Sequence, residues 1–236
     1  MAKEKSLILA ADTSSDILKL ALCAPGKTLS RSGTSRRQEE LLLKFLDSLL
    51  GRARAKLSDI GTVAVIRGPG RFTGIRIGLT MAALLARLAG ARAVGITVFE
   101  ALAFQLMGGR SWEKWLAANP GGRLAVVSHA FREEYFVALF SQGPGGRPRQ
   151  QGEPHWFSRV QLNEFLQKEN AAGPLLCAGS GEKRAPLAQV LQASGLVFAT
   201  HKDCLLKIET LAALARLPGK RSLEPLYLKP AKYELS

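Results

Sequence analysis

Cysteine, histidine and long apolar runs are scarce in this chain of 236 residues, and each scarcity excludes a class of protein. The three cysteines, Cys23, Cys177 and Cys204, are odd in number and far apart, which fits reduced thiols rather than a disulfide framework or a zinc site. No apolar run reaches the roughly 18 residues of a membrane span. We therefore expect a cytoplasmic protein without membrane contact.

Catalytic patterns are also missing. The chain has no Gly-x-Ser-x-Gly elbow and no Cys/His pair with a clear orienting partner, so a hydrolase has little support. His201 and Cys204 have ligand-like spacing but lack a second pair, and we expect no metal site there. Four carboxylates could meet across a cleft, but turn and surface roles are the safer interpretation for Asp12, Asp16, Glu133 and Glu134. We predict no catalytic residue.

Positive charge is the one excess in the composition. The formal net charge is +14, which attracts polyanions such as RNA at low salt. A host whose proteins are generally basic would produce the same charge, so both interpretations stay open. A plain RNA-binding module is the function that charge alone predicts.

The order of apolar and helical segments predicts an α/β fold. Strands are expected at Leu7–Ala11, Ile17–Cys23, Thr28–Ser32, Thr62–Ile66, Ala93–Val98, Pro154–Ser158 and Pro174–Ala178. Helices are expected at Arg36–Leu50, Gly74–Leu88, Phe99–Met107, Val160–Gln167, Ala185–Ala193 and Leu205–Leu217. Residues 108–122, which include the short amphipathic piece Trp112–Leu116, suit a connector between the two halves, and residues 142–152 suit a loop.

The opening pattern of the chain recurs after the connector. Leu9-Ala10-Ala11-Asp12 is echoed by Val126-Val127-Ser128-His129, and Ala21 by Ala138, each 117 residues later. The repeat predicts two halves, 1–110 and 111–236, each with a mixed sheet flanked by helices. In an alternative domain division, a C-terminal segment packs back on the first half.

A glycine-rich loop, Gly68 to Gly74, lies between a predicted strand and a predicted helix. Its glycines permit close backbone approach, Pro69 stiffens the turn, and Thr73 is placed to cap the helix. The loop lacks the Lys of a P-loop, and a close-packed turn and an anion site are both open. For Asp12, Thr13 and Ser14 at the first hairpin tip, turn formation and ligand contact are likewise both open.

The amino-acid sequence of the loop resembles a segment of a known family. Gly68-Pro69-Gly70-Arg71-Phe72-Thr73-Gly74-Ile75-Arg76-Ile77-Gly78 resembles the segment G-P-G-S-F-T-G-[IV]-R-[IV]-G of the TsaB (YeaZ) family. The resemblance implies the actin-like ATPase superfold with two RNase H-like halves. It favours ligand contact by Asp12, Thr13, Ser14, Gly68, Pro69, Gly70, Thr73 and Gly74, with ATP or ADP at or near a partner interface.

Two segments depart from the family pattern. His129-Ala130-Phe131 stands where the family commonly has Asp-Ala-Arg, and Gln38 stands where a histidine is usual. These departures put contacts by those positions in doubt.

The same resemblance implies a non-catalytic subunit that supports a TsaD-like enzyme in transferring a threonylcarbamoyl group to adenosine of tRNA. Its implied partners are a TsaD-like subunit, a TsaE-like ATPase, tRNA through the complex, and a second copy when the chain is alone. The alternative is a free-standing ATP-dependent phosphotransferase of the same superfold, favoured by Asp12 and the glycine loop.

The two long helices of the first half hold more apolar residues than one sheet face needs. We expect them to bind the partner, and the resemblance points to the same pair. The expected contact residues are Leu42, Phe45, Leu46, Leu49, Arg76, Gly78, Ala82, Leu85 and Ala86. Packing of the excess apolar residues against the second half of the chain is the competing interpretation.

Overall fold

The computed structural model describes residues 6–180, 195–219 and 222–229 of the chain. Two compact units are present: Met1–Thr97 with Lys207–Leu226, and Val98–Leu206 with Tyr227–Ser236. The first unit thus ends before residue 110, because the helix that begins at Val98 packs on the second sheet. The helix expected at Ala185–Ala193 lies outside the described residues.

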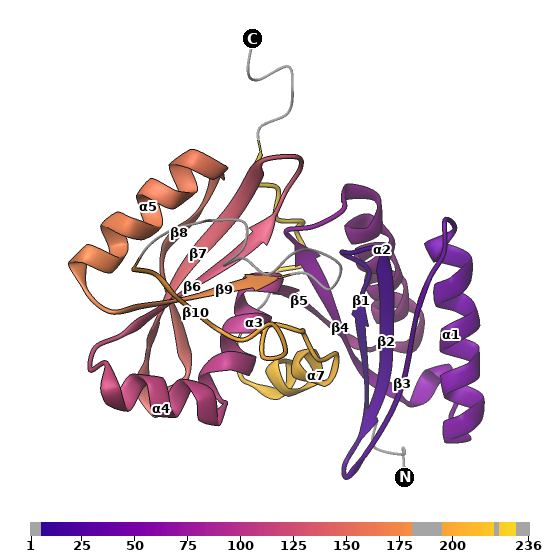
Figure 1. Cartoon of the computed structure of the whole chain (residues 1–236). Helices are drawn as coiled ribbons and strands as arrows, with labels where there is room; N and C mark the ends of the chain where they lie inside the picture. Colours follow the sequence, from indigo (N-terminus) through magenta and orange to yellow (C-terminus); the bar gives the residue numbers. More distant parts are fainter. Residues whose placement is uncertain (1–5, 181–194, 220–221, 230–236) are drawn as a thin grey trace. The chain divides into compact units, whose positions relative to one another are not determined.

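The first unit is a five-stranded mixed sheet in the order β3-β2-β1-β4-β5 (Figure 1). β1 pairs with β2 antiparallel and with β4 parallel, and β4 pairs with β5 parallel. Its elements are β1 (Leu7–Asp12), β2 (Ile17–Ala24), β3 (Lys27–Thr34), α1 (Gln38–Ala53), η1 (Leu57–Asp59), β4 (Ile60–Gly68), α2 (Phe72–Ala89), β5 (Arg92–Thr97) and α7 (Glu209–Arg216).

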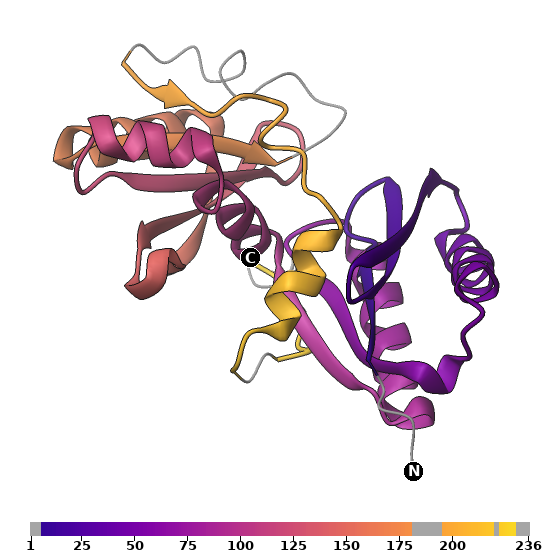
Figure 2. The same cartoon turned by 90° about the horizontal axis from the view of Figure 1, so that it is seen from below.

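Alternation along the strands divides the apolar residues between two layers. Leu9 and Ala11 belong to a buried cluster with residues of α1 and α2. α7 packs against β1, β2, β4 and β5, and Figure 2 shows it on the opposite side of this sheet from α1 and α2. Because both faces are covered, β1 and β4 are apolar along nearly their whole length.

The second unit has the order β10-β9-β6-β7-β8. α5 packs on β7 and β8 through one cluster, and α3 packs on β6, β7 and β8. The elements are α3 (Val98–Met107), α4 (Arg110–Ala118), β6 (Arg123–His129), β7 (Glu134–Gln142), η2 (Pro144–Gly146), β8 (Pro148–Ser158), α5 (Arg159–Ala172), β9 (Leu175–Ser180) and β10 (Val197–Phe198).

The two sheets repeat one topology. In each, the first strand pairs antiparallel with the second and parallel with the fourth, and the third strand is an edge. The spacing of 117 residues places Asp12 at the end of β1 and His129 at the end of β6. The prediction of an α/β fold with two mixed sheets flanked by helices is confirmed.

Two predicted boundaries are wrong. The expected connector contains a helix, α4, held by the buried Trp112, whose ring lies 5.2 Å from that of Trp115. β8 begins at Pro148, inside the expected loop, because this edge strand needs backbone pairing with β7 rather than an apolar pattern.

α2 is, by its 18 residues and its composition alone, long and apolar enough to cross a membrane. Eight of its residues are buried in the first unit, among them Ile75, Met81 and Leu85. A core helix of a protein that spans no membrane passes the same test.

Candidate functional site

The predicted ligand residues meet at one edge of the first sheet. β1 and β4 are parallel neighbours, so their carboxyl ends lie at the same edge. β1 ends at Asp12 and leads into the turn of residues 12–16, while β4 ends at Gly68 and leads into the glycine loop. These residues therefore lie close together, and their contact with a ligand stays a prediction.

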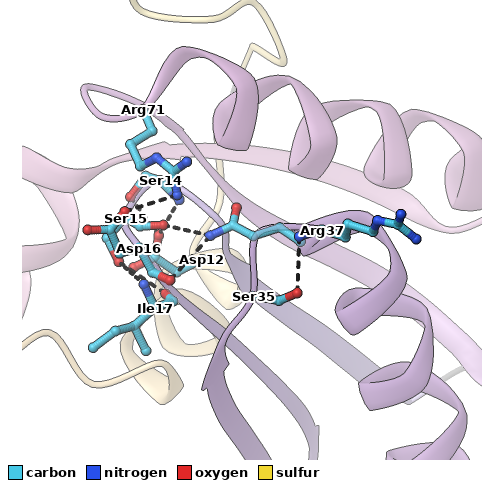
Figure 3. A network of polar contacts seen from close by, with 9 residues as sticks. Asp12, Ser14, Ser15, Asp16, Ile17, Ser35, Arg37 and Arg71 are labelled. Carbon is cyan, nitrogen blue, oxygen red and sulfur yellow. Dashed lines mark hydrogen bonds and ion pairs between the residues drawn. The ribbon is translucent and has the colours of Figure 1, made fainter.

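The turn is held by its own short polar side chains (Figure 3). The backbone N–H of Ser14 and the Ser14 hydroxyl both donate to Oδ1 of Asp12, at 2.9 and 2.6 Å. The hydroxyl of Ser15 bridges to Ile17 in the same way, accepting from its N–H at 3.1 Å and donating to its carbonyl at 3.0 Å. Asp12 and Ser14 are both buried. The turn is thus a preformed structure in which Asp12 acts as an internal acceptor.

The glycine loop and α2 lie directly on this turn. The N–H of Arg71, the N-cap residue of α2, donates to the carbonyl of Ser14 at 2.7 Å. A Cβ on Gly70 would lie 2.5 Å from the same carbonyl oxygen, and one on Gly74 would overlap the carbonyl oxygen of Thr13. These glycines are required because side chains there would collide with backbone.

Thr13 is enclosed by this contact. Its side chain is 1% exposed, and a Cβ on Gly78 would lie 2.5 Å from its hydroxyl oxygen. Within the described part of the chain, that hydroxyl has no hydrogen-bond partner. A buried hydroxyl without a hydrogen-bond partner carries a desolvation cost, so the close approach of α2 to Thr13 lowers the stability of the fold by that cost.

Gln38 fastens the turn from the side of α1. It is 4% exposed, and its amide nitrogen donates to the carbonyl of Ser15 at 2.8 Å. The guanidinium of Arg71 forms an ion pair with Asp16 at 3.1 Å on the solvent side of the turn, which Figure 3 shows. Gln38 therefore has a structural contact at the position where the family pattern has histidine.

Gly68 lies against the C-terminal segment around Leu226 rather than against the turn. A Cβ on Gly68, whose φ is +131°, would lie 2.6 Å from the carbonyl oxygen of Leu226. The N–H of Leu226 donates to the carbonyl of Arg67 at 2.7 Å, and the Arg67 guanidinium donates to the carbonyl of Glu224 at 3.1 Å. The Gly68–Pro69 peptide bond is cis.

Thr73 does not cap α2. The helix already begins at Phe72, Arg71 is its N-cap, and no side chain accepts a capping hydrogen bond there. Thr73 is exposed in the first turn. The start of α2 is instead attached to the turn of residues 12–16 through the backbone N–H of Arg71, which donates to the carbonyl of Ser14.

The glycine loop differs from a phosphate-binding loop in what its glycines face. A phosphate-binding loop offers open space beside its glycines and free N–H groups at the helix start. Here Gly68, Gly70 and Gly74 face the chain's own backbone, and the N–H of Arg71 is already bonded. A nucleotide at an interface with a partner stays a prediction.

Titratable groups outside the turn offer little further chemistry. Burial raises the pKa of Cys23 and Cys204, and it raises the pKa of Cys177 to about 12. These thiols are therefore protonated and poor nucleophiles at neutral pH. Among the described residues, no three His, Cys, Asp or Glu side chains gather as a metal site.

Most of the expected partner-contact residues lie in the core of the first unit, which corrects that expectation. The apolar stripes of α1 and α2 face the sheet, because each helix needs one face for it. The buried members are Leu42, Leu46, Leu49, Gly78, Ala82 and Leu85, while Phe45 and Ala86 are half-buried and Arg76 is exposed.

A different set of apolar residues lies on the outer side of the same helices. Leu43 on α1 is 60% exposed, and Leu84 and Leu88 on α2 are 52% and 67% exposed. Arg76 lies 3.8 Å over the ring of the exposed Phe72, and α2 contains no acidic residue. We call Leu43, Phe72, Arg76, Leu84 and Leu88 the outer helix face. The sequence missed it because apolar content alone does not say which side of a helix meets the sheet.

The hairpin tip of the second unit, residues 129–134, was noted in the sequence for its departure from the family pattern and for the carboxylates Glu133 and Glu134. Phe131 is 59% exposed there, and Lys229 donates to Glu134 at 2.7 Å. No pattern in the sequence predicts this pairing, because the two residues lie 95 positions apart.

Comparison with known proteins gives consistent matches. The family model for TsaD, described as tRNA N6-adenosine threonylcarbamoyltransferase, matches residues 32–131. The chain is 32% identical to the tRNA threonylcarbamoyladenosine biosynthesis protein TsaB of Escherichia coli strain K12, over 94% of both chains. A TsaB of Buchnera aphidicola is 29% identical over 46% of this chain, which corresponds to half of that relative.

A solved structure agrees over the whole fold. A Pseudomonas aeruginosa protein, described as uncharacterized with similarity to peptidase YEAZ, superposes with a TM-score of 0.66 at 25% identity. The superposition covers 95% of this chain and 100% of that one.

Proposed function

Because this chain belongs to the TsaB family, as its match along nearly its whole length shows, we propose that it serves threonylcarbamoyladenosine synthesis in tRNA as a non-catalytic subunit. Its partner is a TsaD-like threonylcarbamoyltransferase. The match of residues 32–131 to the TsaD family model supports a common fold in subunit and enzyme. A TsaE-like ATPase and tRNA join through the complex.

The observation that carries the non-catalytic role is the closed packing of the glycine loop. In an enzyme of this superfold, the carboxyl ends of the central strands are where a ligand would enter. Here that edge is filled, because Gly70 and Gly74 lie on the backbone of Ser14 and Thr13. The loop then acts as a support that fixes the start of α2.

The outer helix face supplies the docking surface in this proposal. Four of the eight large apolar side chains that are exposed in the described residues lie on α1 and α2: Leu43, Phe72, Leu84 and Leu88. Arg76 and Arg87 add positive charge without an acidic residue on α2. A partner helix pair with an apolar face fits this surface, with its acidic residues opposite α2. In the absence of the enzyme, two copies associate through it.

The test is reconstitution with the TsaD-like protein of the same cell. Purified chain, TsaD-like protein, TsaE-like ATPase, ATP, the threonylcarbamoyl donor and unmodified tRNA are combined. Threonylcarbamoyladenosine is then measured by mass spectrometry of the digested tRNA. We expect product only when both this chain and the TsaD-like protein are present. Product without this chain would contradict the proposal.

The alternative of a free-standing ATP-dependent phosphotransferase makes the opposite prediction. It requires the isolated chain to hydrolyse or transfer the γ-phosphate of ATP to a small acceptor. Steady turnover of ATP by the isolated chain, abolished by Asp12→Asn, would favour that alternative. The internal hydrogen bonds of Asp12 with Ser14 are the observation against it.

A further inference from the structure

The β6–β7 hairpin tip, residues 129–134, is a rigid turn that presents an aromatic ring to solvent. The N–H of Ala130 donates to the carbonyl of Glu134, and the N–H of Glu134 donates to the carbonyl of Phe131, both at 2.9 Å. The ring Nε2 of His129 lies 2.6 Å from the carbonyl oxygen of Arg132, so that nitrogen carries the proton and donates. Three hydrogen bonds thus fix the backbone on both sides of Phe131.

Arg132 adopts an unfavourable backbone conformation in this turn. Its φ is +52°, in the left-handed region that residues with a side chain rarely adopt. In this conformation its guanidinium lies 5.1 Å from the centre of the Phe131 ring. Phe131 remains 59% exposed, so the contact covers one part of the ring and leaves the rest open.

The carboxylates of the tip are neutralised within the second unit. Glu133 pairs with Arg159 at 2.8 Å, and Glu134 pairs with Lys229 at 2.7 Å. Arg132 forms no ion pair with any residue that the structure describes, so one positive charge is left at the tip. The tip therefore presents the exposed Phe131 ring to a partner, beside the Arg132 guanidinium, which has no ion pair among the described residues.

The equivalent turn of the first unit shows that the fold does not require such a tip. At the spacing of 117 residues, Phe131 corresponds to Ser14 and Arg132 to Ser15. Ser14 is buried and bonded to Asp12, whereas Phe131 is bonded through its backbone only and its ring is exposed. The Phe131 ring contacts the Arg132 guanidinium of the same tip, and most of its surface stays open to a partner.

We propose that Phe131 and Arg132 form a contact for an unpaired base of RNA, with the base stacked on the ring and the guanidinium beside a phosphate or a second base. Unpaired bases stack on aromatic side chains and on arginine planes, and this is the usual way in which proteins grip single-stranded loops of RNA. The net charge of +14 attracts polyanions such as RNA, and the Arg132 guanidinium adds positive charge beside the ring. The choice of RNA as the nucleic acid rests on the proposed function in tRNA modification.

The test measures binding of the full chain, without any partner protein, to a fluorescently labelled tRNA anticodon stem-loop at low salt. Stacking of one base contributes about 1–3 kcal/mol. We therefore expect Phe131→Ala and Phe131→Leu to weaken binding by about 5- to 150-fold, while Phe131→Trp keeps it. Arg132→Lys keeps the charge but loses the planar group, and we expect an intermediate loss.

Val160→Ala is the matched control. Val160 is also exposed, at 65%, and lies next to Arg159 at the start of α5, so its loss removes apolar surface near the tip without removing a ring. Its affinity for the stem-loop should equal that of the wild type. A blunt duplex of the same length should bind all variants alike, since its bases are not free to stack on the tip.

Three results would overturn the inference. The first is no measurable binding of the stem-loop by the wild-type chain. The second is an affinity of Phe131→Ala equal to that of Val160→Ala. The third is an unchanged RNA affinity of Phe131→Ala together with weaker association with the TsaD-like protein, which would make the tip a protein contact. In each case the reconstituted synthesis can still depend on the chain, so the proposed function is judged separately.

Discussion

Gly74 gives the sharpest test of the closed loop, because its close contact leaves no room for a methyl group. In Gly74→Ala the new Cβ overlaps the carbonyl oxygen of Thr13, which is backbone and cannot rotate away. Overpacking of this kind costs about 3 kcal/mol, and the better helix propensity of alanine returns about 1 kcal/mol. We expect a net loss of about 2 kcal/mol in the free energy of unfolding.

The matched control is Gly51→Ala in α1. No atom lies within 4 Å of a Cβ at Gly51, so only the helix propensity changes, and we expect a gain of about 0.5–1 kcal/mol. The two substitutions are chemically identical but should shift stability in opposite directions. The difference comes entirely from what each glycine faces.

Urea unfolding followed by far-ultraviolet circular dichroism measures both variants. With a slope of about 2 kcal/mol per molar urea, the Gly74→Ala midpoint should fall by about 1 M. All three tryptophans, Trp112, Trp115 and Trp156, lie in the second unit, so fluorescence follows that unit as an internal comparison. A midpoint for Gly74→Ala equal to or above the wild-type value would refute the reasoning.

Three further predictions follow from burial. Leu84→Glu, on the outer helix face, should leave the chain folded but abolish its co-elution with the TsaD-like protein. Ala82→Glu, at a position that is 0% exposed, should instead unfold the first unit. Equal partner binding by Leu84→Glu and wild type would contradict the docking proposal. Thr13→Val removes a buried hydroxyl that lacks a described partner and should raise stability by about 1 kcal/mol in urea unfolding; a loss of stability would show that the hydroxyl is used. Because burial raises the pKa of Cys177 to about 12, the folded state holds the thiol proton more firmly than the unfolded chain, so stability is fully present below pH 9 and is lost as pH rises towards 12. Unfolding followed by tryptophan fluorescence at rising pH should show a smaller loss of stability for Cys177→Ala than for wild type. Stability curves of the two proteins that run parallel with pH would contradict the raised pKa of Cys177.

The sequence predicted the fold well because the buried strands are nearly continuous apolar runs. Leu7–Ala11 and Ile17–Cys23 match β1 and β2 almost to the residue, and the spacing of 117 residues correctly indicated a second sheet. Burial on both faces leaves little freedom for such segments to be anything but central strands. The parts that depend on edge pairing were less predictable, as the early start of β8 at Pro148 shows.

The sequence predicted which segments lie together at the candidate site but not what those segments contact. The sequence grouped Asp12–Ser14 with the glycine loop, and both lie at one sheet edge. Whether a glycine faces a ligand or the protein's own backbone depends on contacts between segments more than 50 residues apart, such as Gly74 with Thr13. The same limit explains why Leu42 and Leu49 were expected at an interface but lie in the core.

The most direct test of the central claim is the requirement for this chain in reconstituted threonylcarbamoyladenosine synthesis. The reaction holds the TsaD-like protein, the TsaE-like ATPase, tRNA, ATP and the threonylcarbamoyl donor constant while wild-type chain, Leu84→Glu or Gly51→Ala is added. We predict modified adenosine with wild type and Gly51→Ala, and little with Leu84→Glu or without the chain. Equal product in all four reactions would contradict the account.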